Sequence, residues 1–195
     1  MTGTLKKVCV MATTALVIGG PSLANGPNGD GTVSSADIMA SGNPGIDGTA
    51  TIYRDAAGIG VDAVVTGLRG GFPYTMWAVI FNNPQQCLAF PEPCGPADFG
   101  VDGTPSNPAV TQASLNYADD AGNAYFSGFV AVGGALSNGN KAEVHFVYRR
   151  HPDEDGAEYE SLNMVGGNCP LNPDGSFDDG PADDQCQDEG FSIHQ

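Results

Sequence analysis

Apolar and polar positions alternate along this chain in short segments, and the most apolar segment covers residues 74–81. Successive side chains of a β-strand point to opposite faces. In a strand over 74–81 both faces are apolar or uncharged, with Tyr74, Met76, Ala78 and Ile80 on one and Thr75, Trp77, Val79 and Phe81 on the other. Such a strand has to be covered on both sides, so we expect it at the centre of the fold.

Shorter runs of β-branched and alternating apolar residues predict further strands, each bounded by turn residues. These strands are expected at residues 48–54, 60–66, 109–118, 124–132, 142–150, 160–165 and 190–194. No window keeps the period of an amphipathic helix. The chain is therefore expected to be all-β, an antiparallel β-sandwich of about seven or eight strands with long acidic loops.

The first 24 residues have the three parts of a secretory signal peptide. Lys6 and Lys7 supply the positive charge, residues 8–18 are apolar, and Ser22-Leu23-Ala24 is a small-x-small cleavage site. The apolar run is shorter than the roughly 20 residues of a membrane-spanning helix. We expect a secreted or periplasmic protein with no membrane insertion after cleavage. Its expected parts are a signal peptide at 1–24, a flexible arm at 25–46 and a single β-sandwich domain at 47–195.

The cysteines fit export from the cell. Cys9 would leave with the signal peptide, and an even number of cysteines remains. Nearest-neighbour pairing joins Cys87 to Cys94 and Cys169 to Cys186, each pair across a loop rich in Pro and Gly. Two disulfides suit an oxidising compartment. The alternative is a four-thiolate zinc site, but the cysteines lack the tight spacing of a zinc knuckle.

The chain is strongly acidic. Its formal net charge of −16 becomes −18 once Lys6 and Lys7 are removed. Nucleic acid phosphates and anionic membranes would repel such a chain, so neither is expected as a partner. A saline habitat, cation binding and simple solubility are all compatible with this composition.

One stretch, residues 28–37, looks like the calcium loop of a dockerin or EF-hand repeat. Asn28, Asp30, Ser34 and Asp37 would supply oxygen ligands at alternating positions. The first ligand position falls on Gly26, which has no side chain to offer. The alternative to a calcium site is a plain polar loop.

The three histidines, His145, His151 and His194, all lie in or beside the last predicted strands. His145 and His151 are about 20 Å apart along an ideal strand, so a shared site needs a bend and a last strand that brings His194 alongside. Two histidines and one acidic group would then suit zinc or copper. The acidic candidates are Glu143, Asp153 and Glu154. The alternative is that the histidines are exposed or hydrogen-bonded within the protein.

Arg149 shares a predicted strand face with His145. It could bind the carboxylate or sulfate group of a ligand with two hydrogen bonds, as an anion anchor. The alternative is an ion pair with the acidic residues 153–155.

Two resemblances rest on these residues. The layout G-x-A-x-I, V-x-x-V-x-G-L, a Gly-rich turn and an aromatic strand resembles that of copper–zinc superoxide dismutase and CHRD-type domains. Those families have metal-binding histidines on the strand after the glycines, where this chain reads MWAVIFNN, so the resemblance does not imply their catalytic activity.

Over residues 48–194 the chain is more similar to a group of uncharacterised secreted bacterial proteins. That group combines G-L-x-x-G-x-x-Y-T-x-W-x-V-x-F-N-x-P-x-x-C, a strand like AEVHFVYRRH and a closing C-x-x-x-x-F-x-x-H. The resemblances imply a sandwich of the immunoglobulin-like or superoxide-dismutase-like kind, and no particular activity.

Enzyme motifs are absent from the sequence: there is no G-x-S-x-G, no H-E-x-x-H, and no phosphate-binding or dinucleotide motif. We therefore expect a secreted binding protein that uses His145, His151 and His194 to bind a transition metal or a small ligand. One alternative is a secreted metal-dependent hydrolase or oxidoreductase with Arg149 as anchor. Another is a structural or surface-associated module without a small-molecule site.

Overall fold

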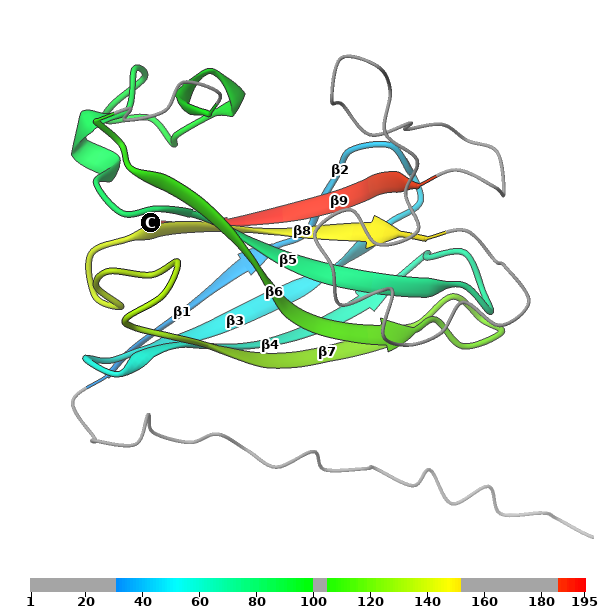
Figure 1. Cartoon of the computed structure of the whole chain (residues 1–195). Helices are drawn as coiled ribbons and strands as arrows, with labels where there is room; N and C mark the ends of the chain where they lie inside the picture. Colours follow the sequence, from blue (N-terminus) through cyan, green and yellow to red (C-terminus); the bar gives the residue numbers. More distant parts are fainter. Residues whose placement is uncertain (1–30, 100–104, 152–185) are drawn as a thin grey trace, which may run out of the picture.

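The computed structural model describes residues 31–99, 105–151 and 186–195, which form a β-sandwich, as the sequence predicts. Two antiparallel sheets pack face to face (Figure 1). The four-stranded sheet has the order β1 (Thr32–Asp37), β3 (Asp47–Arg54), β4 (Gly58–Thr66), β7 (Ala124–Ala131). The five-stranded sheet has the order β2 (Met39–Ala40), β9 (Gln187–His194), β8 (Glu143–Arg150), β5 (Pro73–Phe81), β6 (Pro108–Tyr117). Two short 3-10 helices, η1 (Pro84–Gln86) and η2 (Pro96–Asp98), lie between β5 and β6.

Strand β5 is central and covered on both faces, as predicted. It pairs with β6 on one side and with β8 on the other. Its inner side chains, Tyr74 and Ile80 among them, are fully buried between the sheets. On its outer face, Phe81 packs with Cys87, Cys94 and the partly buried Phe99 in a second, smaller cluster. The inner face of β5 is therefore apolar because it packs in the core, and the outer face because it packs against the disulfide loop.

The core lies between the two sheets, where the inner side chains of facing strands interdigitate. Its fully buried members include Ile52 of β3, Val61 of β4, Phe126 of β7 and Phe146 of β8. Because both sheets contribute large side chains to one cluster, the two sheets form a single folding unit.

The predicted strands from 48–54 onward correspond to β3 to β9, with ends that differ by no more than a few residues. The predicted strand at 160–165 and the signal peptide at 1–24 lie outside the described residues.

Residues 31–46 differ from the prediction of a flexible arm, because they belong to the sandwich. β1 pairs with β3 along its whole length, and β2 pairs with β9. Between them, Ile38 is buried in the core. The hydrophobic pattern of the sequence does not predict β1, because five of its six residues are exposed. An edge strand held by backbone hydrogen bonds needs no hydrophobic alternation.

The predicted disulfide between Cys87 and Cys94 is present, with an S–S distance of 2.01 Å. Cys169 lies outside the described residues, so its pairing with Cys186 stays a prediction. Within the described ranges, the fold contains no helix with the length and apolar character needed to cross a bilayer.

Candidate functional site

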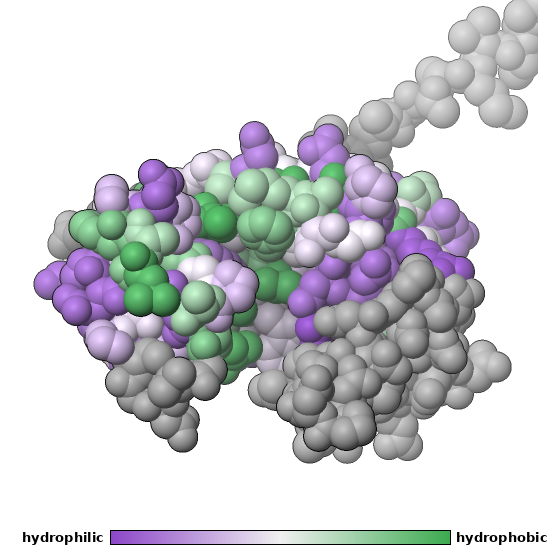
Figure 2. Space-filling view, turned by 90° about the horizontal axis from the view of Figure 1, so that it is seen from above, coloured by the Kyte–Doolittle hydropathy of each residue, from purple (hydrophilic) through white to green (hydrophobic). Residues whose placement is uncertain are grey.

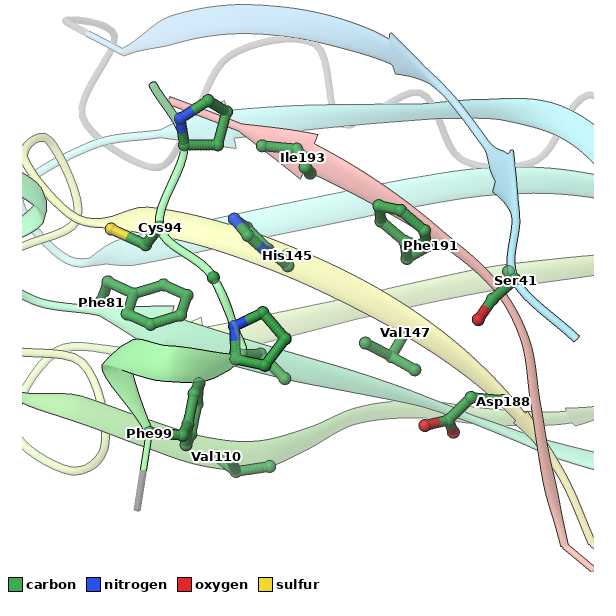
Figure 3. Close-up of a pocket in the computed structure, with 15 residues that line it drawn as sticks. Ser41, Phe81, Cys94, Phe99, Val110, His145, Val147, Asp188, Phe191 and Ile193 are labelled. Carbon is green, nitrogen blue, oxygen red and sulfur yellow. The ribbon is translucent and has the colours of Figure 1, made fainter. Parts of the chain in front are cut away.

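An apolar groove of about 670 Å³ lies on the outer face of the five-stranded sheet. The apolar side chains of its floor include Val147 of β8, and Phe191 and Ile193 of β9 (Figure 3). Val79 of β5 also lines the groove. These side chains face outward because they alternate with the core-facing positions of the same strands. In the space-filling view of this side, hydrophobic residues gather across the middle of the surface between hydrophilic margins (Figure 2).

The disulfide-closed loop after β5 forms one wall of the groove. Residues 93–96 pass over β8 above His145 (Figure 3). Asp98 holds this loop in shape, because its carboxylate accepts the backbone N–H groups of Leu88 and Gly95, each at 2.9 Å. The ring of Phe99 packs edge-on against Phe81, with ring centroids 5.2 Å apart. The wall is therefore anchored both by the disulfide and by packing on the sheet.

The polar part of the floor is the imidazole of His145, which is paired with the carboxylate of Glu143 beneath it. His145 Nε2 lies 2.6 Å from Glu143 Oε1, two residues earlier on the same face of β8. The same carboxylate oxygen accepts the backbone N–H of Cys94 at 2.7 Å. Glu143 is 2% exposed and the His145 side chain 12% exposed. Only the imidazole of this pair lines the groove.

The opposite end of the groove contains Asp188 of β9 and Ser41, which follows β2 (Figure 3). Asp188 forms a two-point ion pair with Arg149, with Nε–Oδ1 at 2.6 Å and Nη2–Oδ2 at 2.9 Å. The guanidinium predicted as an anion anchor thus binds a carboxylate of its own chain. Arg149 thus forms an ion pair, with Asp188 of β9 as a partner, while the predicted partners 153–155 lie outside the described residues.

The structure does not bring the three predicted metal-binding histidines together. His145 lies opposite Ile193 and faces the groove. His194 lies opposite Val144 and faces the core, with its ring centroid 5.7 Å from that of Phe146. Because adjacent positions of a strand pair point to opposite faces, the sheet itself separates His145 from His194.

His151, the third histidine, lies just beyond β8. It is fully buried, and its Nε2 lies 2.7 Å from Thr75 Oγ1. Burial, and to a lesser extent the charge of Arg149, lower the pKa of His151 to about 4. Burial also lowers the pKa of His194 to about 4, together with the charge of Arg54. Both are neutral, internally bonded histidines, which was the alternative to a metal site.

Within the described ranges, one group of side chains has the proximity of a metal site: Cys87, Cys94 and Asp98. The two sulfurs form the disulfide, so neither is a thiolate that could bind zinc or copper. The acidic candidates Asp153 and Glu154 lie outside the described residues.

The predicted calcium ligands Asn28 and Asp30 also lie outside the described residues, so this site stays a prediction. The described part of that segment, from Thr32 to Asp37, is the extended strand β1. Ser34 and Asp37 are exposed on it. A strand does not supply the compact turn that an EF-hand loop requires.

The sequence analysis did not predict the groove. The feature that points to it is the apolar outer face of the strand at 74–81, which requires a cover. The cover comes from the disulfide loop, which reaches Phe81 but leaves Val79, Val147 and the outer side of β9 open to the groove.

No protein-family model matches the chain, and no curated protein matches it either. The resemblances drawn from its motifs therefore stay predictions.

Proposed function

We propose that this protein is a secreted binding protein that holds a small apolar molecule in the groove on its five-stranded sheet. The groove itself is the observation that supports the proposal. Its volume of about 670 Å³ lies within the range typical of small-molecule sites, which are mainly apolar with a few polar groups. Secretion rests on the signal-peptide pattern of residues 1–24 and on the Cys87–Cys94 disulfide, which favours an oxidising compartment.

A second candidate function is catalysis by the Glu143–His145 pair. A carboxylate that orients an imidazole is a common arrangement for a general base. Among the described residues of the groove lining, the one that carries a hydroxyl is Ser41. It lies at the other end, beside Asp188 and away from His145 (Figure 3). The groove therefore favours binding over nucleophilic catalysis.

The test of binding is titration with Nile red, a neutral apolar dye whose fluorescence rises in apolar surroundings. We expect saturable binding by the protein and about tenfold weaker binding by Val147→Gln, because an amide in the apolar floor lacks hydrogen-bond partners. Val64→Gln is the matched control, since Val64 is 58% exposed on the outer face of the other sheet. Non-saturable fluorescence, or equal weakening by both variants, would overturn the proposal.

A further inference from the structure

The groove floor has one polar side chain, His145, whose hydrogen-bonding role follows from its surroundings. Glu143 Oε1 accepts the backbone N–H of Cys94, a group that can only donate. The same oxygen faces His145 Nε2 at 2.6 Å. In the neutral imidazole, a carboxylate oxygen that accepts both contacts places the one ring hydrogen on Nε2 and leaves Nδ1 as an acceptor.

His145 Nδ1 has no hydrogen-bond donor from the described parts of the chain, and the ring is 12% exposed at the groove floor. The floor therefore offers a ligand one hydrogen-bond acceptor, the lone pair of His145 Nδ1. A hydroxyl, an amine N–H or an ammonium group complements it, whereas a carboxylate would place negative charge against it.

Charge near the groove also disfavours an anionic ligand. None of the described groove-lining residues is Lys or Arg. The carboxylate of Asp188, which lines the groove, binds the guanidinium of Arg149 through two hydrogen bonds. The Glu143 carboxylate lies behind the imidazole, and the whole chain carries a formal net charge of −16.

We infer that the groove selects apolar molecules that carry one hydrogen-bond donor on a neutral or cationic head, such as long-chain alcohols or amines, and rejects carboxylates of the same chain length. This inference rests on the proposed function and assigns His145 as the residue that sets its specificity. The apolar floor binds the hydrocarbon part, and Nδ1 accepts the donor of the head group.

The test is displacement of Nile red at pH 8 by two pairs of ligands. Octan-1-ol and its isomer 1-methoxyheptane differ in the donor but not in composition. We expect the alcohol to bind about three- to tenfold more tightly than the ether, the value of one net hydrogen bond, although the ether is the less polar of the two. Octylamine is expected to displace the dye better than octanoate, because their head groups differ in the sign of the charge.

His145→Phe keeps a planar ring at the floor and removes the acceptor. We expect this variant to lose the preference for the alcohol over its ether isomer, measured relative to its own affinity for Nile red. The wild-type order of ligands is informative even if this variant fails to fold. If Nile red binds saturably and Val147→Gln weakens it, yet ether equals alcohol or octanoate exceeds octylamine, this inference fails while the proposed function stands. If Nile red does not bind saturably, both fail.

Discussion

At the residue scale, the three histidines differ in their surroundings: one faces the groove and two are buried. His145 faces the groove, whereas His194 faces the core and His151 is fully buried beside Thr75. The outcome depends on which face of the sheet each ring occupies, because burial favours the neutral form of an imidazole. The two buried histidines therefore make stability sensitive to acid.

Stability is expected to fall as the pH is lowered from about 6.5 to about 4, because the pKa values of His151 and His194 are lowered from 6.5 to about 4 on folding. In this window the unfolded chain binds protons that the folded chain excludes, while above it both states are neutral. The loss amounts to about 3 kcal/mol per histidine at most, reached only below about pH 4. Urea unfolding of wild type and His151→Asn at pH 7.5 and pH 4.5 measures it. An equal loss of unfolding free energy in both proteins would contradict this account.

At the scale of elements, the loop between β5 and β6 completes the outer face of the sheet. Its disulfide closes a short segment, with a sequence separation of 7 between Cys87 and Cys94. The chain after this segment packs Phe99 on Phe81, and residues 93–96 line the groove beside His145. The same loop therefore contributes both to stability and to the shape of the groove.

Removal of the disulfide in the double variant Cys87→Ala/Cys94→Ala is expected to lower the free energy of unfolding by about 2–3 kcal/mol, from the greater entropy of the unfolded chain. It should also weaken Nile red binding, since the wall of the groove is no longer held. Denaturant unfolding and dye titration measure the two effects on the same samples. Unchanged dye affinity in a destabilised variant would show that this loop is not the wall.

At the scale of the whole molecule, the two sheets are joined by a buried cation as well as by the core. Arg54 of β3 is 5% exposed and donates to the carbonyl oxygens of Gly139, Ala142 and His194 at 3.0, 2.6 and 3.0 Å. Burial lowers the pKa of Arg54, and the nearby Glu143 carboxylate opposes this effect. One side chain of the four-stranded sheet thus binds the end of β9 in the other sheet.

Arg54→Met is expected to cost about 3 kcal/mol or more of unfolding free energy, because buried carbonyls lose their donors. Lys141→Met removes the same charge from an exposed position and is expected to change stability by less than about 0.5 kcal/mol. Thermal and urea unfolding compare the two. Similar stability of both variants would show that the net charge, rather than the link between the sheets, is what matters.

Much of the fold could be read from local patterns. The strands from β3 to β9 carry alternating or continuous apolar residues, and Cys87 and Cys94 flank a turn-rich loop. β1 could not be predicted, because its partner β3 holds it through the backbone while its side chains stay in solvent. Of the candidate site residues, His145 lies in the groove, whereas Arg149 pairs with Asp188, a residue of the groove lining.

The sequence by itself determined an all-β chain with an export signal pattern, one central strand that requires cover on both faces, and a nearby pair of cysteines. These properties depend on neighbours a few residues apart, which alternation and spacing record directly. Only the tertiary structure decided which face each histidine occupies, that Arg149 meets Asp188, and that the disulfide loop leaves part of the outer face open. These facts depend on strand register between segments far apart in the chain, and no local pattern encodes that register.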